Sequence, residues 1–360
     1  MIVTPLIIGG ISAIAGITGI AKGGKAISNN NKAKELIADA QRKYDTAKES
    51  LEEQREITSR DLETLGITKV NCWSNDIGSF IECFKNFKNV DLQENANLTE
   101  KLNLQTDSTK NFENMQVAAL KATEVVKAGV SSLGAGALAG IASYGGAMMF
   151  ASASTGTAIA TLSGAAATNA TLAWFGGGSL AAGGLGMAGG TAVLGGIVAG
   201  PVLAVAGFIM AAKSQENLSK AQKTHSEAIL AAEKMDTMTD FMSKVSDISN
   251  NYNLFINEFS ARFNLVLSEL EKIYINALTE QEKYFGNKIR KLFGIKIKID
   301  YRKLNITQQK KLQLSWLMAQ VLYTVLAAPI MTQDGNLESN VYVTLSDAKE
   351  TSQKLLATGA

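Results

Sequence analysis

The sequence is poor in histidine, cysteine and proline. Its 360 residues contain one His, two Cys and three Pro. A single histidine excludes a multi-histidine metal centre of the kind found in zinc fingers and zincins. So few prolines leave few interruptions, which favours long helices. The 35 basic and 33 acidic residues nearly cancel to a net charge of +2, so the overall charge does not indicate nucleic acid as a partner.

A catalytic arrangement of side chains is also absent from the sequence. Two glycine-rich runs match nucleotide-binding patterns only in part. In the first, residues 19–26, Ala26 stands where a phosphate loop needs a hydroxyl group for magnesium. The second, residues 184–189, is not preceded by a strand. We therefore expect no enzymatic activity and no cofactor, and an undetected enzyme is the least favoured alternative.

The most informative absence is that of charge over one long stretch. The chain from Ala128 to Ala212 includes no Asp, Glu, Lys, Arg or His. Soluble domains contain about 25% charged residues throughout, so an uncharged stretch of this length is unusual. Residues 128–212 are here named the uncharged block. The chain then divides into an apolar, membrane-competent N-terminal segment (1–27), an amphipathic helical region (32–127), the uncharged block, and a long helix followed by a C-terminal helical bundle (213–360).

The apolar N-terminal segment resembles a secretory signal peptide only in its length. Its lysines, Lys22 and Lys25, follow the apolar run, whereas an export signal has its basic residues before that run. The sequence therefore predicts that the chain is not exported and is first located in the cytoplasm. In that compartment Cys72 and Cys83 are reduced thiols, for which packing in a core is the favoured role.

Apolar residues at helical spacing predict an all-α fold. Steps of three and four form a coiled-coil or bundle seam through Ile37, Ala40, Tyr44, Ala47 and Leu51. This helix is predicted to end near Gly66, a favourable residue after a helix C-terminus. Further helices are expected at 71–90, 108–127 and 308–328, and one at about 213–278 that is either unbroken or folded back once. Residues 295–300 alternate like a strand, but no partner strand is evident.

Glycine and alanine dominate the uncharged block. It contains 20 of the 32 glycines, 24 alanines and 25 strongly apolar residues. Small residues four apart let helix backbones approach closely in a bilayer, as in a glycine zipper; the pairs are Gly136/Gly140, Gly186/Gly190 and Gly196/Gly200. A flexible linker is disfavoured because linkers are polar. A buried helical core remains the alternative to membrane insertion, which we favour.

The hydrophobicity of the block predicts conditional insertion into a bilayer. Its most hydrophobic window, Thr191–Met210, holds ten strongly apolar residues. Their insertion into a bilayer is favourable by roughly 3–6 kcal/mol before the cost of inserting the glycines and Pro201 is subtracted. Such a small net free energy of insertion suits a segment that amphipathic helices cover in water until it is released into the bilayer. Basic residues on both sides favour two cytoplasmic ends and an even number of crossings, as one hairpin or two; these are Lys121, Lys127, Lys213 and Lys220. Trp174 and Phe175 mark the expected bend.

Two longer segments resemble known proteins. TLAWFGGGSLAAGGLGMAGGTAVLGGIVAGP (Thr171–Pro201) and LGITKVNCWSNDIGSFIECFKNFKNV (Leu65–Val90) are similar to an uncharacterised bacterial family with this layout, over roughly residues 32–340. The layout of a Gly/Ala-rich hairpin between amphipathic helices also resembles the pore-forming domains of colicins and the apolipoprotein L family. Unlike colicins, the chain has no receptor or translocation region, and this departure favours action within the producing cell. A toxin or defence effector is expected, and membrane remodelling stays open as a setting.

These observations predict an α-helical, membrane-inserting and permeabilising protein. Long amphipathic helices would surround, or be attached to, the Gly/Ala-rich hairpin. The expected partners are the lipid bilayer and further copies of the same chain in the membrane, with an unidentified regulatory protein as a further partner and no nucleic acid. The expected locations are the cytoplasm and the inner (plasma) membrane. The alternative function is a constitutively membrane-anchored coiled-coil scaffold without pore activity.

Overall fold

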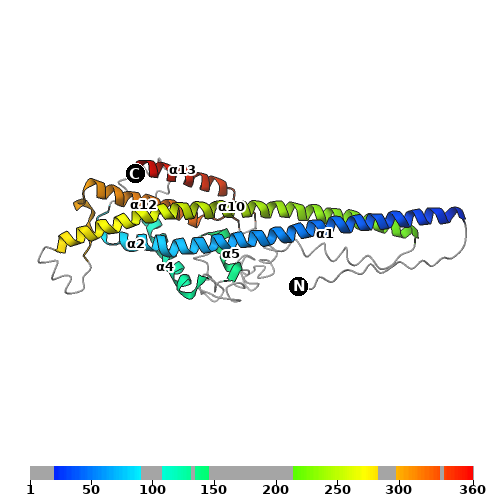
Figure 1. Cartoon of the computed structure of the whole chain (residues 1–360), viewed down its shortest axis with the longest axis horizontal. Coiled ribbons are helices and arrows are strands. Elements are labelled where there is room, and N and C mark those ends of the chain that lie inside the picture. The colour runs from blue at the N-terminus through cyan, green and yellow to red at the C-terminus, as the bar shows by residue number, and fades with distance from the viewer. Residues whose placement is uncertain are drawn as a thin grey trace. The chain divides into compact units, whose positions relative to one another are not determined.

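The prediction of an all-α fold is confirmed. The structure, a computed structural model, describes residues 20–90, 108–130, 134–145, 214–282, 297–332 and 336–359, and these are mainly helical. The chain forms two compact units: the first comprises Met1–Ser50 and Val198–Asp236, and the second comprises Leu51–Ile197 and Thr237–Ala360. Figure 1 shows two long helices, α1 (Ile20–Asn71) and α10 (Ser214–Glu282). Each of them contributes residues to both units.

In the first unit, the described parts of α1 and α10 bury small side chains. Most of the buried apolar positions are alanines, with Tyr44 and Met235 as the larger members. A polar group also joins the helices here, because Asp39 on α1 accepts a hydrogen bond from Nε2 of His225 on α10 at 3.0 Å. Arg42 and Lys43 on α1 pair with the same carboxylate. The His225 bond is the largest of these influences, and together they hold the pKa of Asp39 well below its usual range.

In the second unit, the helices pack around one hydrophobic core. The remainder of α1 and α10 join α2 (Gly78–Phe84), α4 (Ser108–Ala128), α5 (Gly134–Tyr144), α12 (Ile306–Ala327) and α13 (Val341–Gly359). Aromatic rings fill the centre, where Phe80 lies against Phe84, Phe263 and Trp316. Cys72 and Cys83 are buried free thiols in this core, and burial raises the pKa of both. Large buried rings contribute far more apolar area than alanines do.

The first long helix does not end near Gly66, and that prediction is wrong. α1 continues to Asn71 and passes directly into a π-helical turn, η1 (Cys72–Ile77), and then into α2. Gly66 is therefore an interior helical residue. Its lack of a side chain serves a contact: a Cβ there would lie 2.1 Å from the carbonyl oxygen of Leu138 on α5. A glycine that permits close backbone approach cannot be told from a helix-ending glycine by its position alone.

The second long helix is unbroken, which rejects the folded-back alternative. Two matching polar groups, here named the aspartate clamps, join α10 to α1 and to the π-helical turn η1 within the second unit. In each clamp, one aspartate accepts hydrogen bonds from a serine hydroxyl and from the amide of an asparagine one helical turn further along α10. The members are Asp61, Ser246 and Asn250 in one clamp, and Asp76, Ser260 and Asn264 in the other.

The π-helical turn brings the second clamp into position. The two serines are separated by two heptads, as are the two asparagines, whereas the two aspartates are separated by two heptads and one further position. Two heptads return a helix to the same face, but one more residue turns an α-helix by about 100°. A π-helical turn closes its hydrogen bonds one residue later than an α-helix and so takes up one extra residue. η1 contains Asp76 and therefore restores its alignment with α10.

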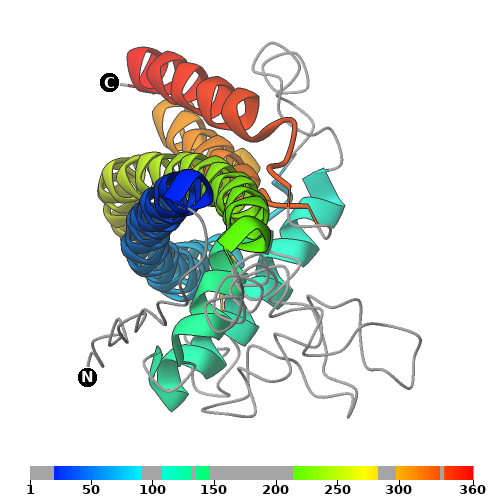
Figure 2. The same ribbon diagram turned by 90° about the vertical axis from the view of Figure 1, so that its right-hand side faces the viewer.

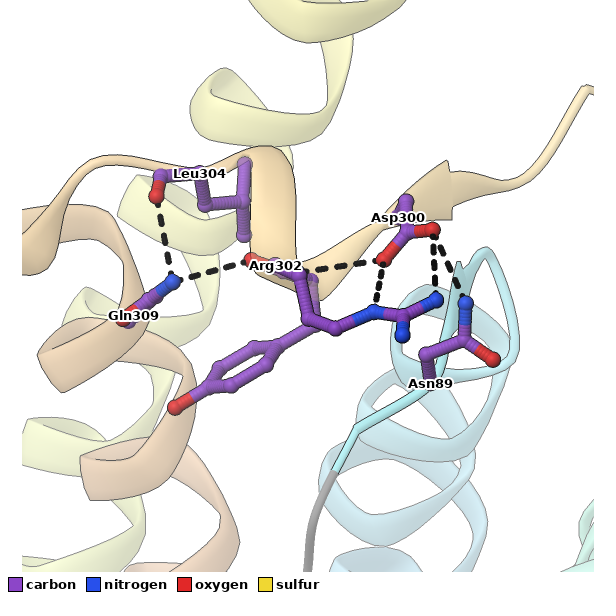
Figure 3. Close-up of polar contacts among 6 residues, drawn as sticks. Asn89, Asp300, Arg302, Leu304 and Gln309 are labelled. Atoms are coloured by element: carbon purple, nitrogen blue, oxygen red, sulfur yellow. Dashed lines mark hydrogen bonds and ion pairs between the residues drawn. The ribbon is translucent and has the colours of Figure 1, made fainter.

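The predicted strand does have a partner, contrary to expectation. β2 (Ile299–Asp300) pairs in parallel with β1 (Phe87–Lys88), which follows α2. Side chains reinforce the pairing: the Asn89 amide donates to Asp300 at 2.8 Å, and the Arg302 guanidinium pairs with the same carboxylate (Figure 3). The Arg302 hydrogen bonds lower the pKa of Asp300 to about 2.

The C-terminal helices begin and end at recognisable signals. Asn305 and Gln308 form a reciprocal capping box at the start of α12, and Pro329 follows shortly after its end. Gln309 further fixes this start by donating to the carbonyls of Tyr301 and Leu304 (Figure 3). Both views show α13 lying beside α12 (Figures 1 and 2).

Candidate functional site

The region of functional interest is the place where the uncharged block begins. Its first helix, α5, lies in the core of the second unit, with Leu138, Ile141, Ala142 and Tyr144 among the buried residues. The backbone of α5 at Leu138 occupies the space that a side chain at Gly66 of α1 would take. The contact therefore places helix backbone against helix backbone, the close approach that small residues permit.

The C-terminal end of α5 is held by backbone contacts to the chain after α12. The carbonyl of Ser143 accepts hydrogen bonds from the amides of Ile330 and Met331, at 2.6 and 3.0 Å. Gly145 follows in a left-handed conformation (φ +55°), and a Cβ on it would lie 2.5 Å from the carbonyl oxygen of Ala327. Only glycine fits this position without strain, because both the backbone conformation and the space exclude a side chain.

A buried lysine completes the attachment of α5. Lys69 on α1 is 0% exposed, and its Nζ donates to the carbonyl oxygens of Ala142 and Ala328, each at 3.1 Å. The same nitrogen lies 5.7 Å from the ring centroid of Tyr252 on α10. Burial lowers the pKa of Lys69 to about 7. One amine thus links α1, the first helix of the uncharged block and the end of α12.

The residues predicted from the sequence fall into three groups. Gly140 is buried in α5, and Gly136 belongs to the same helix. Lys121 is half-buried and Lys127 is exposed on α4, the helix before the block, and Lys220 is exposed on α10 in the first unit. The remaining predicted residues lie outside the described part of the chain; they are Trp174, Phe175, Gly186, Gly190, Gly196, Gly200, Pro201 and Lys213.

The helix that precedes the block exposes apolar side chains to solvent. On α4, Val117 is 44% exposed and Leu120 is 59% exposed. The opposite face of the helix is buried in the core through Met115, Ala118, Ala122 and Val125. α4 therefore presents a small apolar surface on its outer side, at the entrance to the uncharged block.

Comparison with family models, curated proteins and solved structures found no match to this chain. Within the ranges that the structure describes, no helix combines the length and apolar character that a membrane crossing requires.

The attachment residues Gly66 and Lys69 were not among those predicted. A signal for Lys69 is present in the sequence, since Leu62, Leu65, Lys69 and Trp73 follow one another in steps of three and four. That spacing continues the apolar seam of the helix and places the lysine on the buried face. No signal in the sequence names α5 as the element that covers it, because that contact joins segments far apart in the chain.

Proposed function

We propose that this protein acts on lipid bilayers by inserting its uncharged block and permeabilising the membrane. It would act from the cytoplasm on the inner membrane, as an oligomer of identical chains, and without catalysis. The observation that carries the proposal is the uninterrupted absence of charge from Ala128 to Ala212. The pore-forming likeness to colicins and apolipoprotein L proteins, and the likeness to a bacterial family, remain predictions.

The attachment of α5 supports conditional rather than permanent insertion. The first helix of the block, α5, packs in a helical core, and the groups that hold its C-terminal end are two backbone amides and one lysine, which donate to its carbonyls. Contacts of this kind can be broken without unfolding the surrounding helices, since local opening costs less than global unfolding. The marginal hydrophobicity of Thr191–Met210 agrees with a segment that alternates between a covered and an inserted state.

We also propose that, within the second unit, α1 and α10 form a parallel coiled coil on which α5 is attached and released. Hydrogen-bonded pairs between the two helices keep a nearly constant separation in sequence throughout the second unit. Residue numbers rise together along both helices, so their directions are parallel. Buried positions on α1 recur in steps of three and four, which is the coiled-coil spacing.

Dye release from vesicles of phosphatidylcholine and phosphatidylglycerol tests the proposal. The wild-type chain should release the dye, and Gly196→Asp should abolish release because a charge at mid-bilayer costs about 2.5–3.5 kcal/mol. That cost is comparable to the whole predicted gain from insertion. Ser50→Asp is the matched control: it adds the same charge at an exposed position of α1, and it should release dye like the wild type.

Two outcomes would contradict the proposal. Equal dye release by Gly196→Asp and the wild type would mean that this part of the block does not cross lipid. Wild-type protein that floats with the vesicles but releases no dye would favour the alternative function, a membrane-anchored coiled-coil scaffold.

A further inference from the structure

The lysine that holds α5 occupies an unusual chemical environment. Both of its acceptors are carbonyls at helix C-termini: Ala142 lies in the last turn of α5, and Ala328 directly follows the last residue of α12. The C-terminal end of a helix carries a partial negative charge that favours a cation. The aromatic face of Tyr252 adds a further attraction.

Burial opposes these attractions. Removing an ammonium group from water costs several kcal/mol unless a charged partner compensates. No carboxylate is among the partners of Lys69 in the described part of the chain. The desolvation penalty prevails, which is why the pKa of Lys69 falls to about 7 from its usual value of 10.5.

We propose that Lys69 is a charge-sensitive latch: its neutral amine holds α5 on the core, and proton uptake loosens α5. The amine can donate both hydrogen bonds without a charge. An ammonium group gains hydration if one of the surrounding helices moves away. α5 is the cheapest helix to move, because it has 11 residues, whereas α12 has 22 and α1 has 52.

The direction of the pH dependence follows from the two protonation equilibria. The attached state binds the proton with a pKa of about 7, and a hydrated lysine binds it with a pKa of 10.5. Proton binding therefore favours the detached state, so attachment weakens as the pH falls from 10.5 towards 7 and changes little below 7. Linkage gives a weakening of about tenfold between pH 8 and pH 6, and about a hundredfold between pH 9 and pH 6.

Other titratable groups near the latch do not change charge in this range. Tyr252 on α10 contacts the amine, Tyr144 ends α5, and Cys72 lies one helical turn beyond Lys69. Burial raises the pKa of each of them: that of Tyr144 rises to about 12, and those of Tyr252 and Cys72 also lie above their usual values. All three stay neutral between pH 6 and pH 9. A pH response of α5 in this interval is therefore assigned to Lys69.

Hydrogen exchange of the full chain without lipid tests the latch directly. The amides of residues 138–144 should lose about a hundredfold in protection between pH 9 and pH 6, after correction for the intrinsic pH dependence of exchange. Lys69→Met, which keeps the length of the side chain without its charge, should give α5 the same protection at both pH values.

Lys244→Met is the matched control, because it makes the same chemical change at an exposed position on α10; it should retain the wild-type profile. A wild-type α5 whose protection does not change with pH would overturn the latch, and so would an unchanged pH response in Lys69→Met. If Lys69→Met does not fold, the wild-type profile decides: protection of residues 138–144 that falls about a hundredfold between pH 9 and pH 6 supports the latch, and protection that does not change overturns it.

Any effect of the latch on membrane permeabilisation rests on the proposed function. The latch and the proposed function can nevertheless fail separately. A pH-dependent α5 without dye release at any pH would retain the latch and refute permeabilisation. Dye release by a chain whose α5 protection is independent of pH would refute the latch alone.

Discussion

Substitution of Gly66 by alanine should detach α5 from the helical core. The new Cβ would lie 2.1 Å from the carbonyl oxygen of Leu138, 2.7 Å from its carbonyl carbon and 3.0 Å from its Cα. All three are backbone atoms of α5, so no side-chain rotation can relieve the clash. Either α1 or α5 must shift, and α5 is the shorter helix.

The expected loss of stability is a balance of three effects. Overpacking of a tight contact costs about 1–3 kcal/mol. A shift of α5 also breaks the Lys69–Ala142 hydrogen bond, and a buried polar group left without its partner costs about 1–3 kcal/mol. Alanine is the better helix former by up to ~1 kcal/mol, which offsets part of this. The net destabilisation should be roughly 1–6 kcal/mol.

Urea unfolding followed by tryptophan fluorescence measures this loss, since Trp73 and Trp316 are buried in the core. Gly78→Ala is the matched control: it makes the same change in the same continuous run of helix, where the nearest atom to a Cβ is 3.8 Å away. The control should be neutral or slightly stabilising. Equal stability of the two variants, with unchanged hydrogen exchange of α5, would refute the close contact between α1 and α5.

Two further predictions concern the second unit. Because the pKa of Asp300 is lowered to about 2 from 3.8, its contribution to stability is present above pH 4 and is lost as the pH falls to about 2. Asp300→Asn should therefore make the melting temperature depend less on pH over that interval. A calorimetric pH profile equal to that of the wild type would contradict this. Deletion of Asn75 should convert the π-helical turn to α-helix and preserve both aspartate clamps, whereas deletion of Glu56, also exposed, should destabilise strongly. Equal melting temperatures by circular dichroism would argue against that explanation of η1.

Local pattern was sufficient to predict most helices. The apolar seam through Tyr44 and Leu51 and the helical periodicity at about 213–278 and at 308–328 each depend on residues a few positions apart. Helical periodicity is a property of such short stretches, so it can be read before any packing is known. α13 was not predicted as a separate helix, and it packs beside α12 in the structure.

Contacts between distant segments explain what the sequence did not predict. The sequence predicts a helix end at Gly66, since the partner that explains this glycine, the backbone at Leu138, belongs to another helix, beyond α2 and α4 in the chain. The partner of β2 is more distant still, since the whole uncharged block and α10 separate β1 from β2. Neither partner has a residue type that identifies it.

The amino-acid sequence by itself determined the class of fold, the long helices and the uncharged block, since these follow from periodicity and from the absence of charge. Only the tertiary structure decided which element covers Lys69 and how α5 is held. Burial, hydrogen bonding and a shifted pKa depend on what surrounds a group in space. The same lysine would be a solvated cation if another face of α1 were covered.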